Sequence, residues 1–127
     1  MTPRKIELGQ EGEELAAAFL KNQGYKIQER NFKNNLGEID IVAWDVDTLC
    51  FIEVKRRTSE LYGTPLYAIS KSKQHKLSQV ALSYLKYHHL MNIKSRFDIV
   101  SIIRNDQGEE CVDVLKDAFD LSSPYSY

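Results

Sequence analysis

At 127 residues, with 43% hydrophobic and 28% charged residues, the chain has the size and composition of one globular domain. A domain of this size can form a hydrophobic core without disulfides or a structural metal. It has no long uncharged apolar run, which argues against secretion and against membrane insertion. Residues 1–104 hold 16 Lys and Arg against 12 acids, and residues 105–127 hold one Lys against six acids. This balance neither requires nor excludes a polyanionic partner.

Hydrophobic periodicity and turn residues divide the chain into helix, three strands, helix and two strands. The predicted elements are a helix over 5–23, strands over 25–32, 38–45 and 49–55, a helix from Ser70 to about Leu90, and strands over 96–104 and 110–115. The passage from strand to helix to strand in the second half implies a crossover connection. We therefore expect an α/β fold, with a mixed sheet of about five strands flanked by helices and a loosely held tail over 116–127.

The two cysteines, Cys50 and Cys111, each lie within an apolar strand, and neither has a second Cys or a His at metal-ligand spacing. Buried free thiols in a reducing compartment are the interpretation that this pattern favours. We expect a cytoplasmic protein.

Two carboxylates and an amine interrupt the apolar residues of the predicted hairpin. Side chains alternate along a strand, so Glu53 and Lys55 share a face. If Val46 and Asp47 form a two-residue turn, paired residue numbers sum to 93 and Asp40 lies opposite Glu53. If the turn slips by one residue, Asp40 pairs with Lys55 instead. Both registers place the three groups on one face.

Like charges directly opposed across a sheet have Cβ atoms only about 4.5–5.5 Å apart and destabilise it. Mg²⁺ offsets such repulsion, because it takes one or two carboxylates, keeps several waters and accepts phosphate oxygens. A neighbouring Lys can orient or deprotonate the attacking water. The set suits phosphodiester hydrolysis, but the wet face of an antiparallel sheet also carries alternating charges, and the spacing alone fits both interpretations.

Ordered motifs along most of the chain, from about Gly9 to Ile103, closely resemble the bacterial YraN-like family of predicted endonucleases. That family belongs to the PD-(D/E)XK nuclease superfamily and is similar to archaeal Holliday-junction resolvases. The motifs are "GxxGExxA" at Gly9, Gly12, Glu13 and Ala16, followed by "GYKIQERN", "GEID", "FIEVKRR" and "RFDIV".

The resemblance implies a restriction-endonuclease-like core and a site that uses Mg²⁺ or Mn²⁺. It assigns the roles as follows: Asp40 as the first acid, Glu53 and Lys55 as the (D/E)XK pair, Glu13 as an extra acid from the first helix, and the carbonyl of Val54 as a further metal ligand. For Glu13 the spacing alone equally fits a solvated acid near a helix N-terminus. Ile39 stands where the superfamily name has Pro, a position that is often variable.

Basic residues bracket the loop after the hairpin and are candidates for binding phosphates. These are Arg56, Arg57, Lys71 and Lys73. A solvated helix face is the alternative for Lys71. Lys73 lies four residues before Leu77, in line with the apolar stripe of the second helix, so we expect it to point toward the sheet edge.

Three other residues allow a structural or a functional interpretation. Tyr62 and Tyr67 lie in the loop after the hairpin, where they could stack on bases or pack the loop. Asp98 lies within the apolar run "RFDIV", and we interpret it as structural support bonded to a neighbouring Arg or helix terminus.

The sequence therefore predicts a metal-dependent endonuclease acting on DNA, with branched or nicked DNA as candidate substrates. The alternative is a non-catalytic module that keeps the nuclease fold and binds nucleic acid or a protein. The small size favours a homodimer, because cutting both strands of a junction symmetrically needs two sites.

Overall fold

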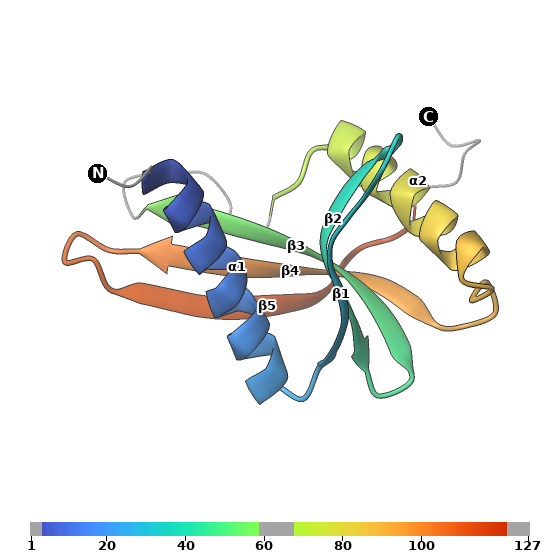
Figure 1. Ribbon diagram of the computed structural model, residues 1–127, viewed down its shortest axis with the longest axis horizontal. Helices are drawn as coiled ribbons and strands as arrows, with labels where there is room; N and C mark the ends of the chain where they lie inside the picture. Colours follow the sequence, from blue (N-terminus) through green and yellow to red (C-terminus); the bar gives the residue numbers. More distant parts are fainter. Residues whose placement is uncertain (1–3, 59–67, 122–127) are drawn as a thin grey trace.

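The computed structural model describes residues 4–58 and 68–121, and in α1 it describes side chains from residue 11 onward (Figure 1). The elements are α1 (Arg4–Asn22), β1 (Lys26–Asn34), β2 (Gly37–Asp45), β3 (Thr48–Thr58), α2 (Lys71–Tyr87), β4 (Ser95–Arg104) and β5 (Glu110–Phe119). One mixed sheet has the order β1-β2-β3-β4-β5, with only β3 and β4 parallel among these described neighbours. The predicted α/β class and element order are confirmed.

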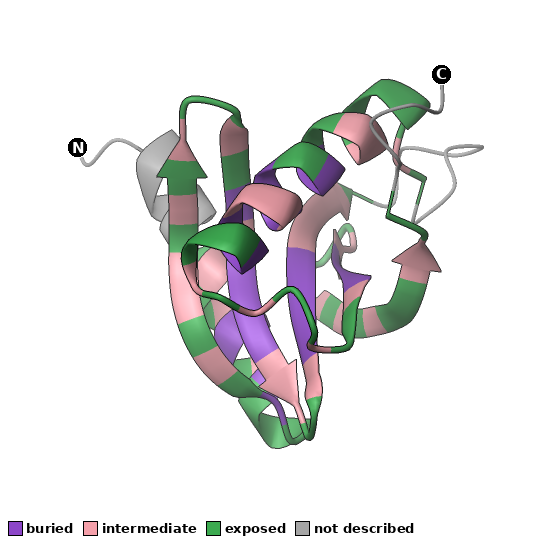
Figure 2. Ribbon diagram, turned by 90° about the vertical axis from the view of Figure 1, so that its right-hand side faces the viewer, coloured by how far each residue is buried: buried purple, intermediate pink, exposed green. Residues whose placement is uncertain are grey.

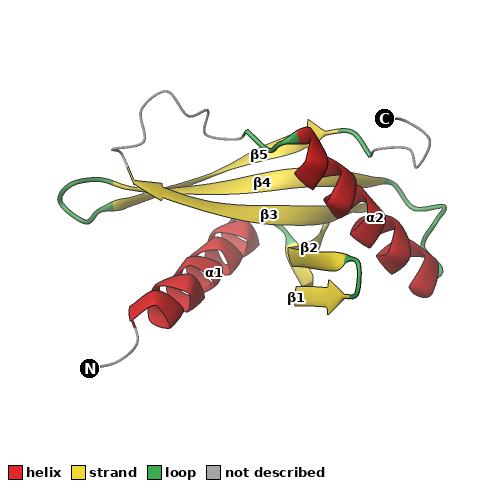
Figure 3. Cartoon of the chain, turned by 90° about the horizontal axis from the view of Figure 1, so that it is seen from above, coloured by secondary structure: helices red, strands yellow, loops and turns green. Residues whose placement is uncertain are grey.

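The two helices cover the sheet through two separate apolar clusters. In β3, Phe51 packs in the cluster with Tyr84 of α2, whereas its neighbour Ile52 packs in the cluster with Leu20 of α1. Since adjacent side chains of a strand point to opposite faces, the helices lie on opposite faces of β3. Figure 2 shows the buried side of α2 toward the sheet, and Figure 3 shows α2 beside the β1–β2 hairpin and well apart from α1.

Gly12 lets α1 approach β3 closely. A Cβ atom at Gly12 would lie 2.5 Å from Cδ of Arg56, so only glycine fits without displacing that side chain. Arg56 also pairs with Glu110 of β5, with Nη2 and Oε2 3.1 Å apart. Arg56 therefore lies on the α1 face and ties α1, β3 and β5 together.

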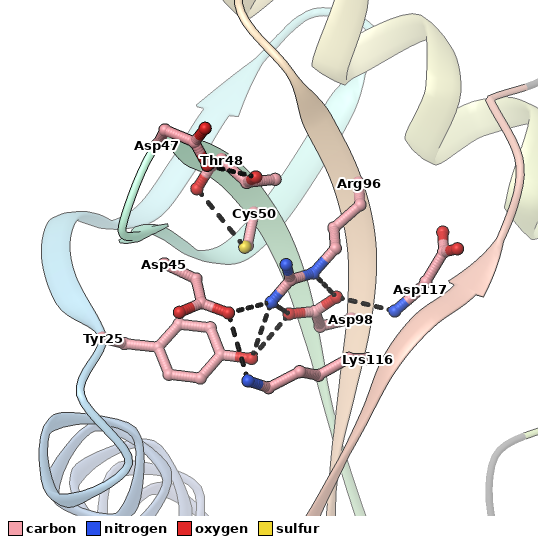
Figure 4. Close-up of polar contacts among 9 residues, drawn as sticks. All are labelled: Tyr25, Asp45, Asp47, Thr48, Cys50, Arg96, Asp98, Lys116 and Asp117. Carbon is pink, nitrogen blue, oxygen red and sulfur yellow. Dashed lines mark hydrogen bonds and ion pairs between the residues drawn. The ribbon is translucent and has the colours of Figure 1, made fainter.

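A buried polar network joins the ends of β2, β4 and β5 to the start of β1 (Figure 4). The Asp98 carboxylate is fully buried and accepts hydrogen bonds from Arg96 Nε at 2.9 Å, from the Tyr25 hydroxyl at 2.7 Å and from the Asp117 backbone N–H at 3.0 Å. Arg96 also pairs with Asp45 at 2.5 Å. The predicted structural role of Asp98, bonded to a neighbouring Arg, agrees with these contacts.

Several element boundaries differ from the predictions, and β1 and β3 run to Asn34 and Thr58, beyond the predicted ends at 32 and 55. The second helix ends at Tyr87 and not near Leu90, because His89 adopts a positive φ of 57° that no helix continues. Residues 116–119 belong to β5 and not to a loose tail, since Lys116 pairs with Asp45 and Phe119 stacks on a β4 aromatic ring.

The prediction of two buried thiols is correct for Cys50 and wrong for Cys111. Burial raises the pKa of the Cys50 thiol to about 12. Cys111 is exposed because β5 is an edge strand, in which Val112 and Val114 pack toward α1 and the alternate side chains face solvent. Tyr62 and Tyr67 lie outside the described residues. No helix in the described ranges is long and apolar enough to cross a membrane.

Candidate functional site

The β2–β3 hairpin has the register that a turn at Val46 and Asp47 predicts. Its pairs run from Asp45–Thr48 to Ile41–Ile52, and their numbers sum to 93. The ladder stops there. Beyond that pair the Val54 N–H donates its hydrogen bond to a side chain, Oδ2 of Asp40 at 2.8 Å, and not to a backbone carbonyl of β2. The two strands thus part next to Asp40.

A hollow of about 500 Å³ opens where the strands part. Both carboxylates that interrupt the hairpin line it. The full set of lining residues is Gly37, Glu38, Asp40, Glu53, Val54, Ser70, Ser72, Lys73, Lys76, Leu77 and Val80. The tip of the β1–β2 hairpin, the open end of the β2–β3 pair and the first turns of α2 therefore form its walls, and Asp40 and Glu53 meet in one solvent-accessible space.

Gly37 lets the tip of the β1–β2 hairpin lie close to α2. Its φ is 150°, and a Cβ atom there would lie 3.1 Å from a methyl carbon of Val80. A larger residue would be strained and would push the hairpin away from the helix. The glycine of the "GEID" motif thus sets the width of the hollow.

The pKa of Asp40 is raised to about 7. Burial is the largest cause, the hydrogen bond from Val54 N–H opposes it, and the negative charge of Glu53 raises it further. The carboxylate of Glu38 adds to the repulsion. At neutral pH the site therefore holds a carboxylate that is only part-ionised and that a nearby cation would stabilise.

Two lysines predicted for the site lie near this pair of acids, of which Lys73 lines the hollow and Lys55 does not. Lys73 reaches from α2, and its Nζ forms an ion pair with Oε2 of Glu53, which raises the pKa of Lys73. Lys73 turns toward the sheet, as its helical spacing predicts, but it reaches the central strand β3 and not the sheet edge. Lys55, two residues beyond Glu53 on the same face, donates from Nζ to the Ala68 carbonyl. Burial, followed by the charge of Arg57, lowers the pKa of Lys55.

The model of the uncharacterised protein family UPF0102 matches residues 12–102. The chain belongs to this family. The UPF0102 protein of Syntrophus aciditrophicus is 40% identical over 119 residues, which cover 94% of this chain and 93% of the relative. That of Geobacter metallireducens is 43% identical over 122 residues, covering 96% and 99%. The YraN-like family predicted from the motifs is confirmed.

In this UPF0102 protein, Glu13 does not line the hollow. Its carboxylate accepts a hydrogen bond from Asn31 Nδ2 at 3.0 Å and lies 4.0 Å from Arg30. The strand pairs on either side, Arg30–Ile41 and Phe32–Ile39, bring Asn31 opposite Asp40. Glu13 thus reaches the strand next to the acid pair and there connects α1 to β1.

The predicted phosphate-binding residues of this UPF0102 protein are divided between the two faces of the sheet. Arg56 lies on the α1 face, paired with Glu110, because alternation along β3 turns it away from the hollow; that it binds phosphate stays a prediction. Arg57 shares the face of Lys55, and Lys71 is exposed at the start of α2, but neither lines the hollow. Lys73 is the member of the set that does.

Sequence reasoning missed several residues of the hollow. Glu38 falls at the start of a predicted strand and Lys76 within the second predicted helix, and neither position predicts a place in the site. Ser70, the first residue of that predicted helix, caps α2, and its hydroxyl accepts a hydrogen bond from the Lys73 N–H at 3.1 Å. Their place in the hollow follows from the packing of α2 against the hairpin tip, which no local pattern encodes.

Proposed function

We propose that this protein is a metal-dependent nuclease that hydrolyses phosphodiester bonds of DNA in the cytoplasm. The observation that carries the proposal is the meeting of Asp40 and Glu53 in one solvent-accessible hollow beside Lys73, with Lys55 two residues further along β3. The ordered motifs that resemble the PD-(D/E)XK superfamily support the same assignment. A sheet surface that is merely wet gives no reason for the raised pKa of Asp40.

The donor set fits Mg²⁺ or Mn²⁺. Within the described ranges, no three His, Cys, Asp or Glu side chains lie close enough together to hold a metal ion by themselves. Mg²⁺ needs fewer, because it binds through one or two carboxylates and fills its shell with waters and substrate phosphate oxygens. Asp40 and Glu53 would hold it, and Val54 lines the same hollow. When bound, the ion supplies positive charge for the phosphate and acidity for a water.

Lys55 is the candidate for moving the proton of the attacking water. Its lowered pKa raises the fraction of neutral amine at neutral pH relative to an ordinary lysine. Lys73 has the opposite property, since its pKa is raised and it stays charged beside Glu53. In the absence of metal it neutralises Glu53, and its flexible stem can move the ammonium to a phosphate oxygen of the substrate.

The Lys73–Glu53 ion pair also supports the second candidate, a module that keeps this fold and binds nucleic acid without cutting it. In such a module the carboxylate already has its counter-ion and needs no metal. Catalysis distinguishes the two candidates.

The test is cleavage of a panel of labelled branched, nicked, single-stranded and duplex DNAs, with RNA counterparts. We expect products from at least one DNA with Mg²⁺ or Mn²⁺ and none with chelator. Binding without cleavage in either metal would favour the non-catalytic module. Equal cleavage with chelator would contradict a metal-dependent mechanism.

A further inference from the structure

A second hollow lies further along α2, beside the turn between β1 and β2. It has a volume of about 640 Å³ and is lined by Leu36, Gln79, Leu82, Ser83, Lys86 and Tyr87. The two hollows lie near each other, because Leu36 and Gln79 of the second are chain neighbours of Gly37 and Val80 of the first. We call their combined length the α2 groove.

The walls of the α2 groove are held together by direct contacts. Asn34 Nδ2 at the end of β1 donates to the Ser83 hydroxyl at 2.9 Å. The hairpin tip and α2 lie side by side in Figure 1. The groove is therefore a fixed feature of the surface, leading away from the acid pair.

The charge of α2 favours an anionic occupant. Its sequence, KSKQHKLSQVALSYLKY, contains four lysines and no acidic residue. Lys76 and Lys86 line the two ends of the groove and are ten positions apart, or about 15 Å along the helix axis. This distance matches several phosphates of one nucleic-acid strand. The acids that line the groove are Asp40 and Glu53, which the proposed metal ion would neutralise, and Glu38, which has Lys33 within 3.6 Å.

The far end of the groove is apolar and aromatic. Tyr87 is 77% exposed and Leu36 is 43% exposed, values that are high for large apolar side chains on a folded surface. Among the described aromatic pairs, Tyr87 forms one, a T-shaped contact with His88 at 5.1 Å between centroids. A free aromatic face beside lysines suits a nucleobase, and base stacking on such rings is independent of sequence.

A duplex cannot use this surface in the same way, because its bases are stacked on one another inside the helix. An unpaired strand offers both the base faces and the phosphates.

We propose that the α2 groove binds an unpaired strand of the substrate, with Lys76 and Lys86 on its phosphates and Tyr87 stacked on a base. The proposal rests on the proposed nuclease function and specifies its substrate: DNA with a single-stranded arm that extends from the cleavage site.

The test is fluorescence anisotropy with a labelled single-stranded DNA 12-mer and the blunt duplex of the same sequence, in chelator so that nothing is cut. Tyr87→Ala should weaken single-strand binding about 5- to 150-fold and leave duplex binding unchanged. Tyr87→Phe keeps the ring and should bind like wild type. Lys86→Ala should reduce the salt dependence of single-strand binding by about 0.7 in slope. Lys94→Ala, an exposed lysine beside Asp47, is the matched control.

Equal single-strand affinity in wild type and Tyr87→Ala would overturn the proposal that the groove binds an unpaired strand. The nuclease proposal would remain, and cleavage of duplex DNA would support it. A dimer that Tyr87→Ala dissociates, with unchanged DNA affinity, would assign the groove to a second copy of the chain and also overturn the proposal. Failure of the wild type to bind or cut any nucleic acid would overturn both proposals.

Discussion

Asp98→Ala is expected to lower the free energy of unfolding by about 3–5 kcal/mol. The substitution removes a carboxylate with no exposed surface and leaves Arg96, which is 19% exposed, without its ion pair at 2.9 Å. It also leaves the Tyr25 hydroxyl and the Asp117 N–H without the acceptor that joins β1 and β5 to β4. Buried donors without acceptors carry most of this cost.

Urea denaturation followed by circular dichroism measures the effect. Lys116→Ala is the matched control, because Lys116 is 49% exposed and its ion pair with Asp45 at 3.1 Å should contribute less than about 1 kcal/mol. Tyr25→Phe removes only the hydroxyl, which donates to Asp98 and accepts from Arg96, and should cost about 1–3 kcal/mol, so it gives a reading even if Asp98→Ala does not fold. Equal stability of Asp98→Ala and Lys116→Ala would contradict a structural role for the network.

Lys55→Ala is expected to slow DNA cleavage by about 10²- to 10⁴-fold, the range that general acid or base catalysis supplies. The loss should fall on the rate constant of the chemical step, since Asp40 and Glu53 remain to hold the metal. The Lys55 side chain is partly exposed, and its hydrogen bond to the Ala68 carbonyl should contribute little to stability.

Single-turnover cleavage measures this rate constant, and the Mg²⁺-induced rise in melting temperature shows whether metal binding is intact. Lys71→Ala provides the control for loss of one lysine near the site, and its effect should be limited to DNA affinity. If Lys55→Ala cuts at the wild-type rate, Lys55 does not move the proton.

Most of the fold could be predicted from the sequence because the apolar periodicities agree with the packing. The turn at Val46 and Asp47 sets the hairpin register, and Val46 adopts the positive φ of 57° that a tight hairpin turn requires. The meeting of Asp40 and Glu53 follows from this register. The break in the ladder beside Asp40 could not be predicted, because it depends on a side chain replacing a backbone acceptor.

The predictions that differ from the structure depend on packing between distant elements. Alternation along β3 predicts that Arg56 faces away from Lys55. That α1 covers this face is seen only from the close approach of Gly12 to the Arg56 side chain. The exposure of Cys111 follows from the edge position of β5, and the length of β5 from contacts that its last residues make with Asp45 and Asp98. None of these contacts leaves a pattern in local sequence.

The central claim, that Asp40 and Glu53 together hold a divalent cation, is tested most directly by thermal melts of wild type and Asp40→Asn at pH 8. The pKa of Asp40 is raised from 3.8 to about 7, so the folded state binds the proton more tightly than the unfolded state does. Stability from this group is therefore lost as pH rises from about 4 to about 7, and at pH 8 the whole penalty is present. Asn keeps an acceptor for the Val54 N–H without the charge.

In chelator we expect Asp40→Asn to be at least as stable as wild type. With Mg²⁺ or Mn²⁺ at a hundredfold excess over Kd, wild type should gain about 2.7 kcal/mol and become the more stable protein, while the variant gains far less. Identical responses of the two proteins to metal would contradict the claim. The charged residues of the hairpin would then be interpreted as the solvent-exposed face of the sheet, with no role in metal binding.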